Sequence, residues 1–407
     1  MPRVRTLDDI GDGSLKGERV FLRADLNVPF SAPGRVADHT RIDATLPTIA
    51  ELMARGARTV LASHLGRPGG TRVPDLSLGP VAVILSERLG TPIRLIDGEP
   101  GEVETRRAVD SIVPGGIAVL ENTRYHPGET SNDAGLARAF GSLADGFVGD
   151  AFGMAHRAHA SNVGAAKAIR DRGGPVVAGR LMSRELHFLS ETLREPRRPF
   201  VALMGGAKVS GKLGLIRTIL SRVDRLLVGG AMANTFLSAL GHEVGRSLVE
   251  ESLVPDAAAI LDEAGGKLVL PVDLTVAAEL DAAAEPVRAD RASVGAGMRI
   301  GDIGPRTGEL YARELASART VVWNGPMGIF ELAPFAVGTA RVAEALADAA
   351  DSGAVVVLGG GDSASAAAAF GVGGRMTHVS TGGGASLDLL AGHELPGVSV
   401  LERGGGG

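Results

Sequence analysis

The sequence contains no cysteine and few aromatic residues, and both absences narrow what the protein can be. Without cysteine it can form neither disulfides nor thiolate metal sites, and it cannot use a thiol nucleophile. Aromatic residues make up 3% of the 407 residues against 44% hydrophobic residues, so we expect cores built from Val, Leu, Ile and Ala. This length favours two domains over one.

Long apolar runs and an excess of basic charge are also missing. No apolar run approaches eighteen residues, and residues 1–13 have no apolar core, so we expect neither a membrane span nor a signal peptide. The formal net charge of -5 argues against a nucleic-acid-binding protein. We therefore expect a cytoplasmic protein in which any anionic ligand is held by a local group of basic side chains.

Strand-like and helix-like segments alternate along the chain. This alternation predicts an α/β fold with parallel sheets and flanking helices. We expect strands at 19–27, 59–63, 117–122, 146–150, 200–204, 225–229, 267–273, 320–323 and 355–358, and helices at 45–55, 81–89, 134–143, 182–193, from 209 onward and at 385–390. The helix at 182–193 precedes the helix-breaking EPRRP, which places the expected domain boundary and hinge within 181–199.

The segment 200–216, FVALMGGAKVSGKLGLI, predicts a phosphate site. An apolar strand ends at Gly205 and Gly206, and a helix follows. The free N–H groups at a helix N-terminus attract anions. Lys208 and Lys212 would share one helical face, and they are two of only five lysines in the chain. The alternative is an ordinary turn with two solvated lysines.

The same segment contains part of a Walker A pattern. Residues 206–212 match G-x-x-x-x-G-K, but Leu213 follows where the pattern needs a Ser or Thr hydroxyl for Mg²⁺. We therefore exclude a P-loop NTPase and retain the prediction of phosphate binding.

Polar residues follow the predicted strands of the first half, where ligands of parallel sheets bind. Several fixed guanidinium groups suit a small ligand that bears carboxylate and phosphate. Taken singly, each arginine could equally be a solvated surface residue. A metal pair at His156 and His159 is disfavoured by the neighbouring arginines. The strand-end residues are Asp25, Asn27, His64, Arg67, Arg124 and Arg157, and Arg41 begins a helix.

The second half contains three more glycine turns after strands, GGAMA at 229–233, GGGDSAS at 359–365 and STGGGAS at 380–386. Asp362 is the one carboxylate within them, and phosphate-bound Mg²⁺ is usually held by one or two carboxylates. Gly382–Gly384 open a predicted helix that could receive a phosphoryl group. The alternative is that these are common turns of an α/β fold.

Eight motifs, in order along nearly the whole chain, resemble the phosphoglycerate kinase family. They are LRADLNVPF, LASHLGRP, LENTRYHPGE, DAFGMAHRAHAS, GGAKVSGKL, VVWNGPMGIFE, GGGDSAS and STGGGASLDLL. The resemblance implies two Rossmann-like lobes with parallel sheets and flanking helices, joined by a hinge helix. It implies an acceptor lobe at 1–183 joined by the tail 391–407, a hinge helix and linker at 184–199, and a nucleotide lobe at 200–390.

The resemblance also implies an activity and a set of site residues. The expected reaction is 1,3-bisphosphoglycerate + ADP ⇌ 3-phosphoglycerate + ATP with Mg²⁺, in a monomer. The implied acceptor residues are Asp25, Asn27, Arg41, His64, Leu65, Gly66, Arg67, Arg124 and Arg157. The implied nucleotide residues are Gly206, Lys212, Asn324, Glu331, Gly360, Gly361, Asp362 and Ser363, with Gly382, Gly383 and Gly384 receiving phosphate.

Individual roles are implied in the same way. Arg41, Lys208 and Lys212 are the expected catalytic residues, Glu331 binds the ribose, and Asp362 holds Mg²⁺.

The chain departs from the usual family pattern at four positions, none of them a charged ligand. They are Gly149, Gly211, Asn234 and Ser363. Gly211, where many members have aspartate, puts the positioning of Lys212 in question. Two other readings stay open, a catalytically weakened homologue that serves as a scaffold and a kinase for another acyl phosphate.

Overall fold

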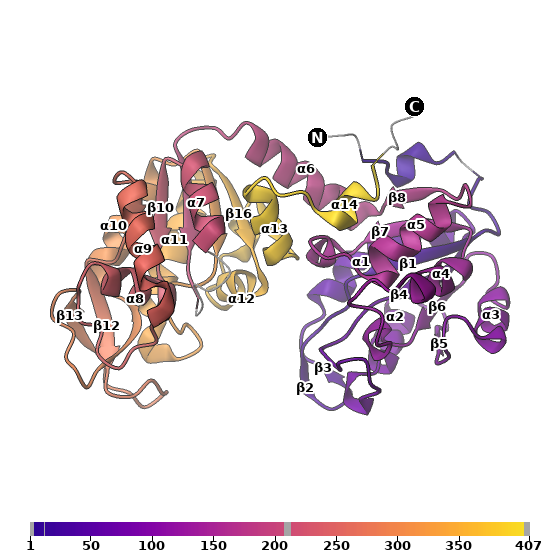
Figure 1. Ribbon diagram of the computed structural model, residues 1–407, viewed down its shortest axis with the longest axis horizontal. Coiled ribbons are helices and arrows are strands. Elements are labelled where there is room, and N and C mark those ends of the chain that lie inside the picture. The colour runs from indigo at the N-terminus through magenta and orange to yellow at the C-terminus, as the bar shows by residue number, and fades with distance from the viewer. Residues whose placement is uncertain (1–3, 12, 207–212, 403–407) are drawn as a thin grey trace. The chain divides into compact units, whose positions relative to one another are not determined.

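The structure is a computed structural model that describes residues 4–11, 13–206 and 213–402. The chain divides into two compact units, unit 1 with residues 1–187 and 394–407 and unit 2 with residues 188–393. Helix α6 (Arg180–Arg194) runs across the boundary between them (Figure 1). None of the described helices is both long and apolar enough to cross a membrane.

Unit 1 is built on a six-stranded parallel sheet in the order β5-β6-β4-β1-β7-β8. Its central strands are almost entirely buried and mostly apolar, as expected for strands covered on both faces. The strands are β1 (Arg19–Ala24), β4 (Arg58–Ala62), β5 (Arg94–Ile96), β6 (Ile117–Leu120), β7 (Gly146–Asp150) and β8 (Val176–Ala178), and β2 (Phe30–Ala32) with β3 (Arg35–Val36) forms a separate hairpin. The helices are α1 (Thr40–Ala54), α2 (Gly79–Leu89), α3 (Val103–Asp110), α4 (Ala134–Ser142) and α5 (Ala165–Arg170).

The C-terminal tail packs within unit 1. It contains the short helix α14 (Pro396–Ser399), and the Arg5 backbone N–H donates to the Leu401 carbonyl at 3.0 Å. The Leu401 side chain lies against Gly149 in β7, where an added Cβ would be 3.2 Å from two Leu401 methyl carbons. Glycine at 149, one of the departures from the family pattern, therefore leaves room for the tail.

Unit 2 contains a second parallel sheet, in the order β11-β10-β9-β15-β16-β17. Its strands are β9 (Phe200–Met204), β10 (Arg225–Val228), β11 (Leu268–Val269), β15 (Thr320–Asn324), β16 (Val355–Gly359) and β17 (His378–Ser380). The helices of this unit are α7 (Leu213–Arg222), α8 (Gly230–Ala239), α9 (Val254–Glu263), α10 (Pro305–Ala316), α11 (Val337–Asp351), α12 (Gly361–Ala369) and α13 (Gly383–Leu390).

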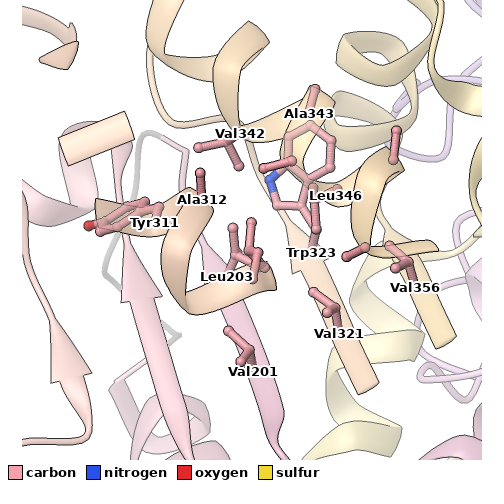
Figure 2. Close-up of a cluster of buried hydrophobic side chains, with 14 of the residues drawn as sticks. Val201, Leu203, Tyr311, Ala312, Val321, Trp323, Val342, Ala343, Leu346 and Val356 are labelled. Atoms are coloured by element: carbon pink, nitrogen blue, oxygen red, sulfur yellow. The ribbon is translucent and has the colours of Figure 1, made fainter. Parts of the chain in front are cut away.

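The core of unit 2 is centred on Trp323, which is fully buried in β15. Figure 2 shows its indole among Val342, Ala343 and Leu346 of α11, with Leu203 of β9 nearby. The indole N–H donates to the Gly325 carbonyl at 2.7 Å. The core thereby fixes the glycine turn that follows β15.

The predicted fold class is confirmed, since both main sheets are parallel and flanked by helices. The predicted strands at 146–150 and 200–204 match β7 and β9. The predicted strand at 267–273 is confirmed only at Leu268–Val269, which form β11, and it is wrong in its extent, because Asp273 begins β12 (Asp273–Ala277) of another sheet.

That other sheet is antiparallel, in the order β13-β12-β14, and it is not among the elements predicted from the sequence. Figure 1 shows β12 and β13 at the margin of unit 2. Strand β13 (Val287–Asp290) is mostly exposed, and its neighbour β14 (Arg299–Ile303) is buried only in its second half. Neither strand has the continuous apolar pattern by which a buried strand is predicted.

Candidate functional site

The predicted acceptor residues gather at one edge of the unit 1 sheet. Strand β1 is central, between β4 and β7 (Figure 1), and the predicted side chains follow the carboxyl ends of β1, β4, β6 and β7. Ligands of parallel sheets bind at this edge. The structure brings together Asp25, Asn27, His64, Leu65, Gly66, Arg67, Arg124 and Arg157, and Arg41 joins them from the first turn of α1.

Asp25 holds Arg41 in place. Asp25 follows β1 and is only 3% exposed, and the Arg41 guanidinium donates to its carboxylate. A buried carboxylate needs such a partner, because an unpaired buried charge is costly. The Arg41 side chain is 28% exposed, so it keeps surface that an anion could reach.

The loop after β4 is built around Gly66. Its backbone N–H donates to Asn27 Oδ1 at 2.8 Å, and the Leu65 N–H donates to Asn122 Oδ1 at 3.1 Å. Gly66 has a φ of +62°, and a Cβ there would lie 2.7 Å from a Leu76 methyl carbon. Both the backbone conformation and the space require glycine, and Asn27 fixes the loop that carries His64.

Arg124 lies among other cations and is partly buried. Its guanidinium Nη1 donates to the Gly66 carbonyl at 2.6 Å. Burial, together with the charges of Arg23 and Arg157, lowers the pKa of Arg124 to about 10. The guanidinium still carries its proton at neutral pH, and a bound anion would relieve the repulsion between these cations.

Two histidines beside these arginines are uncharged at neutral pH. Burial and the charges of Arg23, Arg124 and Arg41 lower the pKa of His64 well below its usual value. Burial and the charges of Arg23, Arg124 and Arg157 lower the pKa of His159 to about 4. His159 Nδ1 is 3.8 Å from a Glu129 carboxylate oxygen, but this neutral ring forms no ion pair with it, since burial and the arginines outweigh one carboxylate.

Arg67 and Arg157 are the exposed members of the cluster. Arg157 Nε donates to His156 Nε2 at 3.0 Å, whereas Arg67 forms no hydrogen bond or ion pair with the described part of the chain. Both charges act on the pKa of Arg124, which places them near it. Exposed guanidinium groups beside a partly buried one can contact an anion from the solvent side.

Arg23 also belongs to this cluster, although it is not among the residues predicted from the sequence, and it differs from the other arginines in being fully buried. It is a fully buried guanidinium in β1, with Nη2 3.4 Å from His64 Nδ1. A signal was present in the sequence, because Arg23 interrupts the apolar strand that precedes Asp25. A charged residue at a buried strand position is nearly always paired.

In unit 2, the glycine turn after β9 packs against the turn after β15. The Gly205 N–H donates to the Asn324 carbonyl at 2.9 Å and the Gly206 N–H to the Pro326 carbonyl at 3.1 Å. A Cβ on Gly205 would lie 2.0 Å from the Pro326 carbonyl oxygen, so only glycine permits this approach. Lys208, Gly211 and Lys212, which follow in the chain, lie outside the described residues.

The other predicted glycine turns meet at the same edge of the unit 2 sheet. Asn324 Nδ2 donates to the Gly359 carbonyl at 2.6 Å, and the Gly325 N–H donates to Ser363 Oγ at 2.6 Å. A Cβ on Gly383 would lie 2.2 Å from the Gly360 Cα, so two backbones touch here. The structure thus brings together Gly206, Asn324, Gly360, Gly361, Ser363, Gly382 and Gly383.

Helices α12 and α13 begin at these turns, and neither has a side-chain cap hydrogen bond at its N-cap residue. Their first N–H groups can therefore bind phosphate oxygens. Gly382 is the N-cap of α13, and Gly384 is exposed in its first turn. This arrangement suits a ligand with several phosphates.

Asp362 and Glu331 are exposed carboxylates that make no hydrogen bond or ion pair with other described residues. Asp362 lies in the first turn of α12, beside the glycine turn, and could hold Mg²⁺ together with phosphate oxygens and water. Within the described ranges, no group of three or more potential metal ligands occurs. Glu331 lies between β15 and α11.

Comparisons with known proteins agree over nearly the full length. A family model described as "Phosphoglycerate kinase" matches residues 8–393. The phosphoglycerate kinase of Chloroflexus aggregans is 47% identical over 398 residues, which are 97% of this chain and 98% of that protein. That of Chloroflexus aurantiacus is 48% identical over equal shares of both chains.

Solved structures give the same result. The phosphoglycerate kinase of Coxiella burnetii has a TM-score of 0.83 and 39% identity, covering 98% of this chain and 99% of that one. The enzyme of Pyrococcus horikoshii has a TM-score of 0.84 and 35% identity, covering 98% of both chains.

Proposed function

The chain belongs to the phosphoglycerate kinase family, and we propose that it catalyses the reversible, Mg²⁺-dependent reaction of 1,3-bisphosphoglycerate with ADP to give 3-phosphoglycerate and ATP. Family membership confirms the resemblance in the motifs and makes the chain a phosphotransferase. The basic cluster, as we call the arginines at the edge of the unit 1 sheet (Arg23, Arg41, Arg67, Arg124 and Arg157), is the observation that supports this choice of acceptor. The family also supports a role in glycolysis. The cytoplasmic location and the monomeric state stay predictions.

The basic cluster has the chemistry that a small phosphorylated carboxylate requires. Arg124 and Arg41 are held by Gly66 and Asp25, while Arg67 and Arg157 are exposed. Guanidinium groups fixed in this way bind carboxylate and phosphate through paired hydrogen bonds. We assign 3-phosphoglycerate to this cluster, with Arg67 and Arg124 as anchors and Arg41 nearest the transferred group.

The glycine turns of unit 2 have the chemistry that a nucleotide requires. The uncapped helices α12 and α13 offer backbone N–H groups to phosphate. We assign ADP and ATP to these turns, with Glu331 on the ribose and Lys212 on phosphate. Asp362 would hold Mg²⁺, which when bound neutralises part of the phosphate charge.

In the direction of ATP use, a carboxylate oxygen of 3-phosphoglycerate attacks the γ-phosphorus of ATP. The new phosphorus–oxygen bond forms as the bond to the β,γ-bridging oxygen breaks, and ADP leaves. Negative charge spreads over the three equatorial oxygens, and fixed cations stabilise it most in the transition state. Arg41 and Lys208 are the cations that we assign to this task.

A coupled assay with 3-phosphoglycerate, ATP and Mg²⁺ tests this function. Turnover should require all three, and each is omitted in turn. A panel of other small carboxylates tests for a different acyl-phosphate kinase, and we expect 3-phosphoglycerate to be preferred. Binding of both ligands without turnover would instead identify a scaffold protein and contradict the proposal.

A further inference from the structure

A chain of hydrogen bonds lies beneath the basic cluster and ends on a carboxylate with 0% exposure, Glu129. Ser161, in the short π-helix η5 (Ala160–Gly164), donates to Glu129 twice, from its backbone N–H at 2.8 Å and from its hydroxyl at 2.5 Å. Arg23 Nε in turn donates to the Ser161 hydroxyl oxygen at 2.9 Å. Glu129 therefore orients Ser161, and Ser161 orients the buried guanidinium of Arg23.

Arg23 in turn faces His64. The Arg23 Nη2 atom is 3.4 Å from His64 Nδ1, and a guanidinium can only donate. His64 Nδ1 must therefore accept, which leaves the ring proton on Nε2 in the neutral imidazole. His64 Nε2 makes no hydrogen bond with the described residues. It is also not one of the fully buried polar atoms that lack a partner, so it keeps some exposed surface. It is the atom that stays available to a ligand.

The surroundings of His64 keep its ring neutral. Charged groups face it from three directions, Arg23 in β1, Arg41 in α1 and Arg124 after β6, and neutral His159 adjoins η5. Burial and these cations hold the pKa of His64 well below its usual value. In the free protein near pH 7, the His64 ring is therefore uncharged, and its hydrogen bond from Arg23 determines that Nε2 carries the proton.

The Glu129 carboxylate also stabilises the positive charge of the buried Arg23. Burial lowers the pKa of Arg23, and Glu129 and Asp25 are the carboxylates that oppose this effect. Without the Glu129 carboxylate, the Ser161 hydroxyl and N–H would both lack an acceptor. Arg23 would then be free to turn toward Asp25, away from His64 Nδ1.

We propose that Glu129 is a positioning residue of the acceptor site, which acts through Ser161 and Arg23 to hold His64 as the Nε2–H tautomer. His64 then meets the acidic acceptor as a hydrogen-bond donor. The inference extends the proposed function, because it takes the basic cluster to be the acceptor site. The tautomer itself is a property of the free protein and does not depend on turnover.

The test uses the full chain labelled with ¹⁵N-histidine, observed without ligand near pH 7. The His64 signals are assigned by their loss in His64→Gln. We expect a pyridine-like shift for Nδ1 and a pyrrole-like shift for Nε2. In Glu129→Gln the two shifts should move toward each other, and the KM for 3-phosphoglycerate should rise about tenfold, while kcat changes less than about twofold.

Two further variants complete the design. Ser161→Ala removes the hydroxyl that joins Glu129 to Arg23 but keeps Glu129. It should therefore reproduce the changes in the His64 shifts even if Glu129→Gln fails to fold. Glu99→Gln is the matched control, because Glu99 pairs with His126 at 2.8 Å outside the cluster, and it should leave His64 and the KM unchanged.

A pyrrole-like Nδ1 in the unaltered chain, or unchanged His64 shifts in both Glu129→Gln and Ser161→Ala, would overturn the inference. Failure of the proposed function alone would look different. The tautomer would then be as expected, but the chain would not turn over 3-phosphoglycerate.

Discussion

Asp302 is a buried carboxylate whose protonation should make the stability of unit 2 depend on pH. It lies near the loop that contains Glu331, the residue predicted to bind the ribose. It lies in β14, 2% exposed, and accepts from the Gly338 N–H at 2.6 Å and the Ile303 N–H at 2.9 Å. It thereby fixes the first turn of α11, and the loop that precedes α11 contains Glu331. Burial outweighs these hydrogen bonds and raises the pKa of Asp302 to about 7.

This raised pKa predicts a loss of stability with rising pH. A carboxyl group with a pKa of about 7 in the folded protein, against an ordinary value of 3.8, contributes stability that is complete below pH 3.8. That contribution is lost as the pH rises through 7. Between about pH 5 and pH 8 the free energy of unfolding of unit 2 should fall by roughly 2.5 kcal/mol from this group alone.

The perturbation is Asp302→Asn, which removes the titration. The amide has one acceptor oxygen instead of two, at a cost of about 1–3 kcal/mol, and this cost is nearly the same at both pH values. Urea unfolding is followed through Trp323, the only tryptophan of the chain, which is buried in unit 2. Equal dependence of the unfolding free energy on pH in both proteins would refute the reasoning.

Three other outcomes are expected. Arg41→Ala should lower kcat, whereas Arg67→Ala and Arg124→Ala should mainly raise the KM for 3-phosphoglycerate; steady-state kinetics decide, and three variants altered only in KM would remove the distinction. Lys208→Ala should lower kcat by about 10²–10³, with a near-normal kcat marking the lysine as a solvated charge. Because transfer requires the two ligands to meet, small-angle scattering should show compaction when both bind, with closure at α6; unchanged dimensions count against it.

The main elements could be predicted from the sequence because their strands are continuous apolar runs. Strands β7 and β9 match the predicted residues, while β1 ends three residues before the expected position 27. Helix α1 begins five residues earlier than expected, at Thr40, whose N–H donates to Asp38 Oδ1 at 2.8 Å. The ends of helices and strands depend on individual hydrogen bonds, which hydrophobic periodicity does not predict.

The candidate site was predictable where residues follow strands, and not where it depends on long-range contacts. Asp25, His64 and Arg124 could be named from their positions at or just after the ends of predicted strands. The chain from Glu129 through Ser161 to Arg23 could not, because its members lie up to 138 residues apart and meet only through the fold.

The most direct test of the account is a pair of calorimetric titrations on two variants, because the central claim assigns the acceptor to unit 1 and the nucleotide to unit 2. Arg124→Ala should weaken 3-phosphoglycerate binding by about 10- to 100-fold, the scale for losing one hydrogen bond to a charged group, and leave ATP binding with Mg²⁺ unchanged. Asp362→Ala should do the reverse, with an unchanged Tm because Asp362 is exposed. Equal weakening of both ligands by either variant would contradict the assignment of one substrate to each unit.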